Sequence, residues 1–249
     1  MGGLAFGETR TRVAARHALI APDGHVPSQF PGITGAVVNV LISPAMGAAI
    51  TQLLVTFEAG GSGDFEANGV ESVLYVEGGG CELLIGSDSH AVGAGGFGFV
   101  PAGVAWEMRD PEAGTRVTIF QKTYVALEGR DGPSAVVGNA ADVEGVPFLG
   151  DPDARLKVLL PETPEFDFGV NVFTYQSGAR LPFVETHVME HGLLMLEGEG
   201  IYRLEDSWYP VRAGDAIWMA PYCPQWFVAM GKGPASYVYC KDVGRGMMP

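Results

Sequence analysis

The chain repeats itself, and this repeat constrains the fold more than any other feature of the sequence. The segment 74–85 (LYVEGGGCELLI) resembles the segment 194–205 (LMLEGEGIYRLE), and the matches at an offset of 120 include a Leu, a Glu and two Gly residues. Further along, Gly95 matches Gly214 at an offset of 119. A register held over this length with a one-residue slip predicts two similar domains, divided between residues 126 and 146.

Each half consists of short apolar runs broken by turn residues. Runs such as FGFVPAG, TRVTIFQKTYVAL and IYRLEDSWYPV are rich in Val, Ile, Phe and Tyr, and 36 Gly and 17 Pro interrupt the 249 residues. Short β-type runs between frequent turns are typical of an all-β sandwich or barrel, and long segments of helical periodicity are absent. The first 30 residues have weak periodicity, so we expect an arm or an edge strand there.

Charge and cysteine content exclude several classes of function. The 29 acidic residues outnumber the 15 basic ones, and the resulting charge of -14 repels a phosphate backbone, so we expect no nucleic-acid partner. No apolar run approaches the roughly 20 residues that span a bilayer, and the N-terminus lacks the pattern of a secretory signal, so we expect no membrane partner. Three Cys without paired spacing suit a reducing cytoplasm, where we expect the protein.

Two of the five histidines lie in the run ETHVMEH, from Glu185 to His191. If this run is a strand, Glu185, His187 and His191 point to one face, because side chains alternate along a strand. A carboxylate and two imidazoles on one buried face are costly unless they bind something, which indicates a metal site. The other histidines stand alone and are better explained as hydrogen-bonded structural residues: His17, His25 and His90.

The same run has a second interpretation. The string from His187 to His191 matches the H-x-x-E-H motif of inverted zinc proteases, whose histidine pair requires a helix. Pro182 shortly before it and Gly192 directly after it disfavour a helix, so we expect a strand.

The motifs of the C-terminal half resemble those of cupins, and their duplication resembles bicupins. The first cupin motif runs H-x-H, three or four residues, Glu, six residues, Gly; the second runs Gly, five residues, P-x-G-x-x-H. Glu185, His187 and His191 keep the spacing of the first motif with two ligand types exchanged, and Gln225 stands at the histidine of the second. The resemblance implies two tandem jelly-roll barrels and a metal bound by Glu185, His187, His191 and Gln225.

The N-terminal half keeps the spacing of both motifs and lacks the ligands. Six residues separate Glu71 from a motif glycine, as in the first motif, but the ligand positions hold Phe65, Ala67 and Trp106, none of which binds a metal. We therefore expect one metal site per chain and a structural role for Glu71.

These patterns together predict an all-β bicupin, two tandem cupin β-barrels of the jelly-roll type. We expect an N-terminal arm over residues 1–30, a cupin without metal ligands over 31–135, and a metal-binding, catalytic cupin over 136–249. Extended β-edges and a strand-like arm also lead us to expect a homo-oligomer.

The chain is also similar, over nearly its whole length, to the (S)-ureidoglycine aminohydrolase family. The similarity rests on ETHVMEHGLLMLEGEGIYRLEDSWYPVRAGDAIWMAPYCPQWF and YVYCKDVGR, and on HALIAPDGHV and VxGNAxD nearer the N-terminus. This family of manganese bicupins, which acts in purine and allantoin catabolism, converts (S)-ureidoglycine and water to (S)-ureidoglycolate and ammonia. The resemblance implies the same hydrolase activity and small-molecule substrate, with Mn²⁺ as cofactor and Fe²⁺ or another divalent metal as alternatives.

The resemblance also carries substrate contacts to Tyr202, Tyr237 and Lys241, and catalytic roles to Tyr237 and Lys241. The ammonium of Lys241 is a flexible point charge able to pair with a substrate carboxylate or ureido oxygen. Two imidazoles, a carboxylate and an amide oxygen form a mixed nitrogen and oxygen site suited to manganese(II) or iron(II).

Two other functions stay open. Two His and one carboxylate also describe an iron(II) dioxygenase site, which Gln225 as a fourth ligand disfavours. The third hypothesis is a non-catalytic bicupin that binds a small molecule. Oxygen consumption would identify the former, and metabolite binding without turnover the latter.

Overall fold

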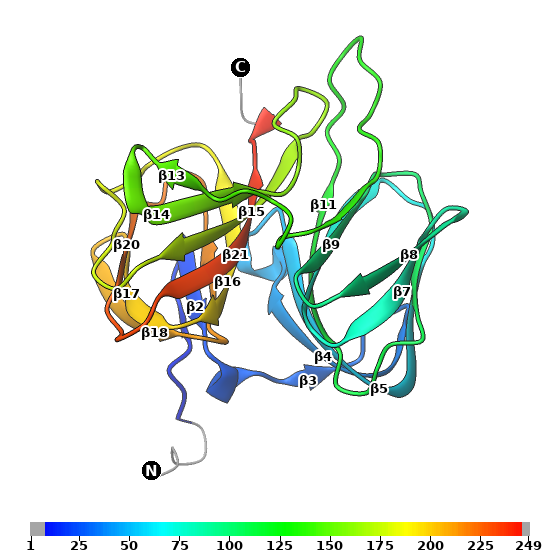
Figure 1. The fold of residues 1–249 in the computed structure, drawn as a ribbon, viewed down its shortest axis with the longest axis horizontal. Helices are drawn as coiled ribbons and strands as arrows, with labels where there is room; N and C mark the ends of the chain where they lie inside the picture. Colours follow the sequence, from blue (N-terminus) through cyan, green and yellow to red (C-terminus); the bar gives the residue numbers. More distant parts are fainter. Residues whose placement is uncertain (1–7, 246–249) are drawn as a thin grey trace.

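The computed structural model describes residues 8–245, which form two β-domains lying side by side (Figure 1). Every strand pairing in this part of the chain is antiparallel, and its helices are two 3-10 turns: η1 (Pro22–Gly24) and η2 (Pro44–Met46). The all-β prediction is therefore confirmed. Within the same residues, no helix has the length and apolar character needed to cross a membrane.

The N-terminal domain is a ten-stranded, barrel-like sheet with the strand order β12-β9-β6-β11-β5-β10-β7-β8, to which β4 and β3 add beside β5. The long strand β5 pairs with β11 at one end and with β10 at the other, so it connects the two walls of the barrel. The strands are β3 (Pro27–Ser28), β4 (Ile33–Ile42), β5 (Thr51–Phe65), β6 (Val70–Gly78), β7 (Gly80–Ile85), β8 (Asp88–Gly93), β9 (Gly96–Val100), β10 (Trp106–Arg109), β11 (Arg116–Thr123) and β12 (Val136–Asn139).

The C-terminal domain packs an eight-stranded sheet, in the order β1-β2-β19-β16-β21-β15-β14-β13, against a three-stranded sheet, β18-β17-β20. The strands of the larger sheet are β1 (Arg12–Val13), β2 (His17–Ile20), β13 (Val146–Phe148), β14 (Asp151–Val158), β15 (Phe168–Tyr175), β16 (Glu190–Glu197), β19 (Ala216–Met219) and β21 (Ala235–Asp242). Those of the smaller sheet are β17 (Glu199–Leu204), β18 (Ser207–Arg212) and β20 (Gln225–Ala229).

The two domains exchange their first strands. The arm strand β2 pairs with β19 of the C-terminal domain, where Figure 1 shows it in blue among later segments, and β12 pairs with β9 of the N-terminal domain. These strands begin 119 residues apart, at positions 17 and 136. The predicted division between residues 135 and 136 thus falls just before β12, the first strand of the second repeat. However, β12 completes the sheet of the N-terminal domain, and β2, its counterpart in the first repeat, completes that of the C-terminal domain.

The structural repeat has a constant offset of 119 from β6 onward, so the one-residue slip expected from the sequence is wrong. The turns after β6 and β16 both use a glycine of positive φ, Gly79 at 78° and Gly198 at 73°. The turns after β7 and β17 likewise contain Gly86 at 60° and Glu205 at 53°. Residues with these left-handed conformations mark equivalent positions in the two domains.

Strand pairing gives the same offset. Ser72 pairs with Val100 in the first domain as His191 pairs with Met219 in the second. Ser72, and not Glu71, therefore stands at the position of His191.

The domains share one apolar core across their junction. It contains fully buried side chains from both, including Ile50 and Phe120 of the first domain and Phe168, Leu194 and Trp218 of the second. A shared core and exchanged strands make the two domains one packed unit.

Candidate metal centre and substrate pocket

Two neighbouring strands of the C-terminal barrel carry polar side chains on their inner face. On β21, the alternation of strand side chains puts Tyr237, Tyr239 and Lys241 on the same side. On β16, His191 is directly opposite Lys241 in the strand pairing, and both line the same cavity. The cavity measures about 280 Å³, a size that suits a small metabolite.

All seven predicted metal and substrate residues line this cavity: Glu185, His187, His191, Tyr202, Gln225, Tyr237 and Lys241. The structure adds Glu162, Met189 and Tyr239, together with apolar side chains that include Phe173, Leu181 and Met219. An apolar wall around a few polar groups lowers the local dielectric and strengthens their electrostatic interactions.

The two imidazoles meet at the centre of the polar wall. Nε2 of His187 lies 3.2 Å from Nε2 of His191, and Nδ1 of His191 lies 3.1 Å from the backbone oxygen of Cys240. A proton on that Nδ1 leaves the lone pair of His191 on Nε2. Two nitrogens bound at right angles to one ion at about 2.1 Å are separated by about 3 Å, so this spacing matches adjacent ligands of a metal.

Both imidazoles are held in the neutral form that binds a metal. Burial lowers the pKa of His191 to about 3, with a further contribution from His187, and burial lowers the pKa of His187 as well. A neutral imidazole keeps its lone pair for a cation.

Gln225 and Glu185 are held together by their backbones. The two residues form an isolated β-bridge, with N–H to oxygen distances of 2.8 and 2.9 Å. The side-chain nitrogen of Gln225 lies 2.9 Å from Nε2 of His187, and Tyr202 donates its hydroxyl to Oε1 of Gln225 at 3.4 Å. The two ends of an amide are interchangeable in shape, so a reversed amide presents its oxygen to His187 and its nitrogen to the Tyr202 hydroxyl, which then accepts the hydrogen bond.

The Glu185 carboxylate lines the cavity apart from the imidazoles. Within residues 8–245, no three His, Cys, Asp or Glu side chains are grouped closely enough to hold an ion. Burial raises the pKa of Glu185, a cost that a nearby cation would offset.

The run from Glu185 to His191 is not the continuous strand that the sequence indicated. β16 begins only at Glu190, and the preceding residues form a loop that the N–H of Tyr222 fixes through the His187 oxygen at 2.7 Å. The side chains converge because this loop folds over the barrel, not because of strand alternation. The run is also not helical, which contradicts the inverted-protease hypothesis.

Tyr202, Tyr237 and Tyr239 line the cavity, and Tyr175 packs against Tyr237. The hydroxyls of Tyr175 and Tyr237 lie 3.0 Å apart, and Asn171 donates its amide to the Tyr239 hydroxyl at 3.0 Å. Burial raises the pKa of Tyr202, Tyr237 and Tyr239, so all three stay protonated phenols at neutral pH. The sequence analysis did not predict Tyr239, although it lies two positions from both Tyr237 and Lys241 and therefore on the same face of the strand.

Lys241 lies at the mouth of the cavity. Its ammonium is 2.8 Å from Oε1 of Glu162, whose side chain is 62% exposed against 19% for Lys241. An ion pair open to solvent is weak, so the lysine is available to an anionic ligand. Glu162 lies in a loop without sequence periodicity and was not predicted.

The N-terminal barrel fills the equivalent place with aromatic rings. Phe65 pairs with Trp106 between β5 and β10, as Glu185 pairs with Gln225, and the two rings stack 4.1 Å apart at 6°. This stack leaves no metal-binding group at those two positions.

The chain is similar to known proteins over most of its length. The model of the cupin domain matches residues 171–240. The chain is 38% identical to a probable (S)-ureidoglycine aminohydrolase of Oryza sativa subsp. japonica, over 96% of this chain and 77% of the relative. It is 34% identical to the (S)-ureidoglycine aminohydrolase of Escherichia coli (strain K12), over 92% and 88%. The crystal structure of protein Ylba from E. coli superposes with a TM-score of 0.86 and 30% identity, over 97% of both chains.

Proposed function

Because the chain belongs to the (S)-ureidoglycine aminohydrolase family, we propose that it hydrolyses (S)-ureidoglycine to (S)-ureidoglycolate and ammonia in the C-terminal barrel. The observation that carries the proposal is that His191 and Gln225 both lie within hydrogen-bond distance of His187 in a small cavity that has Lys241 at its mouth. The reaction replaces a Cα amine by a hydroxyl from water, so the site has to bind a small anion and control protons.

We propose Mn²⁺ as the resident ion, held by His187, His191, Gln225 and Glu185. The donor set supports this assignment, because imidazole nitrogens with carboxylate and amide oxygens suit manganese(II) or iron(II) rather than a soft metal. The bound ion supplies an anchor for the substrate and Lewis-acid polarisation.

The chain's own residues bind and orient the substrate. Lys241 offers an ammonium to the carboxylate or ureido oxygen, in exchange for its exposed pair with Glu162. Tyr202 and Tyr237 keep their hydroxyl protons, so they act as neutral hydrogen-bonding groups rather than as bases. The apolar wall limits access of bulk water to the reacting carbon.

A proton NMR time course tests this function. Freshly generated (S)-ureidoglycine is incubated with manganese-loaded protein, and single-configuration ureidoglycolate is expected to form faster than in the spontaneous decay of the substrate. His191→Ala should lower the rate by about 100-fold or more and lower the manganese content, because it removes a direct ligand.

His90→Ala is the matched control, because His90 lies on β8 of the N-terminal domain, away from the cavity. It should keep the wild-type rate and one ion per chain. Wild-type turnover no faster than spontaneous decay would reject the proposed activity, and oxygen uptake with iron would then favour the dioxygenase alternative.

A further inference from the structure

The residues next to His191 and Lys241 point out of the pocket, toward the N-terminal domain. Glu190 precedes His191 on β16, and Asp242 follows Lys241 on β21. Glu190 pairs with Asp242 across the strands just as His191 pairs with Lys241. Because strand side chains alternate, one pair faces the cavity and the other faces the domain junction.

Lys122, on β11 of the N-terminal domain, lies against this outer face. Its ammonium is 2.6 Å from Oδ2 of Asp167, 3.5 Å from Oδ1 of Asp242 and 3.8 Å from Oε1 of Glu71, and its side chain is 3% exposed. The N–H of Val125 donates to the same oxygen of Asp167 at 2.9 Å. A buried cation that contacts three carboxyl groups holds the segments that carry them in one arrangement.

Glu190 makes a second connection between the domains. Its carboxylate accepts the N–H of Ala49 at 2.9 Å and the indole N–H of Trp218 at 2.6 Å. Beside it, Gly192 packs so tightly that an added Cβ would lie 2.7 Å from Cδ1 of Ile50. This end of β16 is therefore fixed against the N-terminal domain.

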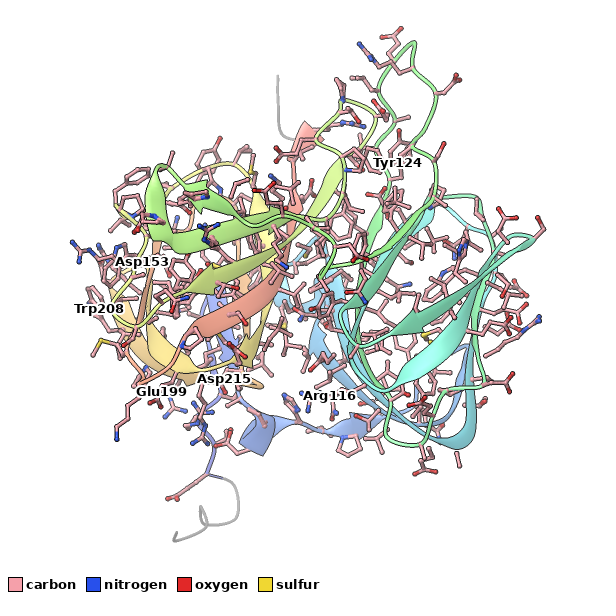
Figure 2. The ribbon with its side chains drawn as sticks, in the orientation of Figure 1. Arg116, Tyr124, Asp153, Glu199, Trp208 and Asp215 are labelled. Carbon is pink, nitrogen blue, oxygen red and sulfur yellow. The ribbon has the colours of Figure 1, made fainter. Side chains whose placement is uncertain are left out.

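A third connection holds the loop 159–167, which carries Glu162 at the pocket mouth. The loop ends at Asp167, the partner of the buried lysine, and Tyr124 donates its hydroxyl to the backbone oxygen of Glu165 at 3.3 Å. Figure 2 labels Tyr124 at the junction, where the chain leaves the N-terminal domain. The loop in turn brings Glu162 to 2.8 Å from Lys241.

From these contacts we infer that Lys122 is a positioning residue for the substrate pocket. It holds Asp167 and Asp242, and thereby sets the loop that carries Glu162 and the end of β21 that carries Lys241. The inference rests on the proposed function, because it takes Lys241 as a group that binds substrate. Through Lys122, the N-terminal domain takes part in substrate binding, although aromatic rings occupy two of the metal-ligand positions in its own barrel.

Steady-state kinetics of Lys122→Met test this role, since methionine keeps most of the apolar stem and removes the charge. We expect the KM for (S)-ureidoglycine to rise about tenfold and kcat to change by less than about threefold, because Lys241 contributes binding. Lys157→Met is the matched control: Lys157 also lies at the domain junction, donating to the Ala140 oxygen at 2.5 Å, but does not line the pocket. It should leave both constants unchanged.

Asp167→Asn tests the same connection with a smaller change, and decides the matter if Lys122→Met is not recovered folded. It keeps the acceptor for the Val125 N–H and removes the negative charge, and we expect KM to rise about fivefold. Lower thermal stability with a wild-type KM in these variants would mean a purely structural role and would overturn the inference, as would a fall in kcat alone.

Amide hydrogen exchange supplies a readout that does not depend on turnover. We expect faster exchange in the peptide 159–167 of Lys122→Met and unchanged exchange in Lys157→Met. If the wild-type protein does not consume ureidoglycine, the proposed function fails, while the exchange data still decide whether Lys122 holds this loop. Equal exchange in both variants would overturn the inference.

Discussion

Glu71 offers a quantitative test of the buried charge cluster. Its side chain is fully buried, and its two oxygens have no hydrogen-bond partner among the described residues. The same holds for Oδ1 of Asp167, since two ionised carboxylates have no proton to share. Among residues 8–245, Lys122 is the one cation that forms an ion pair with Glu71, Asp167 and Asp242. Burial first, and then Asp167, raise the pKa of Glu71 to about 9, so the protonated Glu71 carboxyl is the donor that this arrangement lacks.

Replacing Glu71 by Gln keeps a neutral donor of the same shape and removes the titration. In the wild type, Glu71 ionises near 4.5 in the unfolded chain and near 9 in the folded one. Its contribution to stability is therefore complete below pH 4.5 and falls by about 1.4 kcal/mol per pH unit as the pH rises toward 9. Glu71→Gln escapes this loss, so at pH 7 it should be the more stable protein by up to about 3 kcal/mol.

Urea denaturation from about pH 5 to about pH 8 measures this difference. The advantage of Glu71→Gln should be small at the lower pH and grow steadily with pH. Glu58→Gln, which changes an exposed glutamate of the same domain, should show no such trend. A variant that is less stable than the wild type at pH 7, or a difference independent of pH, would refute the assignment of a proton to Glu71.

Two further substitutions test local features of the C-terminal barrel. Gly198→Ala should lower the free energy of unfolding by about 3 kcal/mol or more, because φ is 73° and the new Cβ would lie 2.3 Å from the Pro234 oxygen. Thermal unfolding measures this loss. Gly233→Ala, where an added Cβ meets nothing within 4 Å, is the control. Tyr202→Phe, which removes the hydroxyl bonded to Gln225, should weaken manganese affinity about tenfold in a metal titration, and unchanged affinity would show that the hydroxyl does not orient the amide.

Local sequence patterns determined the class of the fold and indicated three of the polar residues that line the cavity. Short apolar runs between Gly and Pro predict strands, and the repeat predicts two similar barrels, because strand formation and turn chemistry depend on neighbouring residues. The residue types at Glu185, His187 and His191 predicted a metal site in the C-terminal half. Phe65 and Trp106 predicted that the N-terminal half has none. The motif spacing supplied Gln225 only through resemblance to cupins.

Tertiary structure decided where those residues lie and what holds them. The exchange of β2 and β12 between the sheets and the constant offset of 119 follow from long-range strand pairing, which no local pattern encodes. The loop before β16, and not strand alternation, brings His187 to His191, since loop conformation depends on contacts such as that with Tyr222.

The connection of Lys122 to the pocket could not be predicted from the sequence. In the sequence it is one lysine among alternating strand residues, 45 positions from Asp167. Its role depends on which carboxylates the packed domains bring within a few ångströms of it, and burial then decides how strongly they interact. The sequence alone therefore specifies the chemical groups and their strands, whereas their mutual distances, burial and protonation exist only in the folded protein.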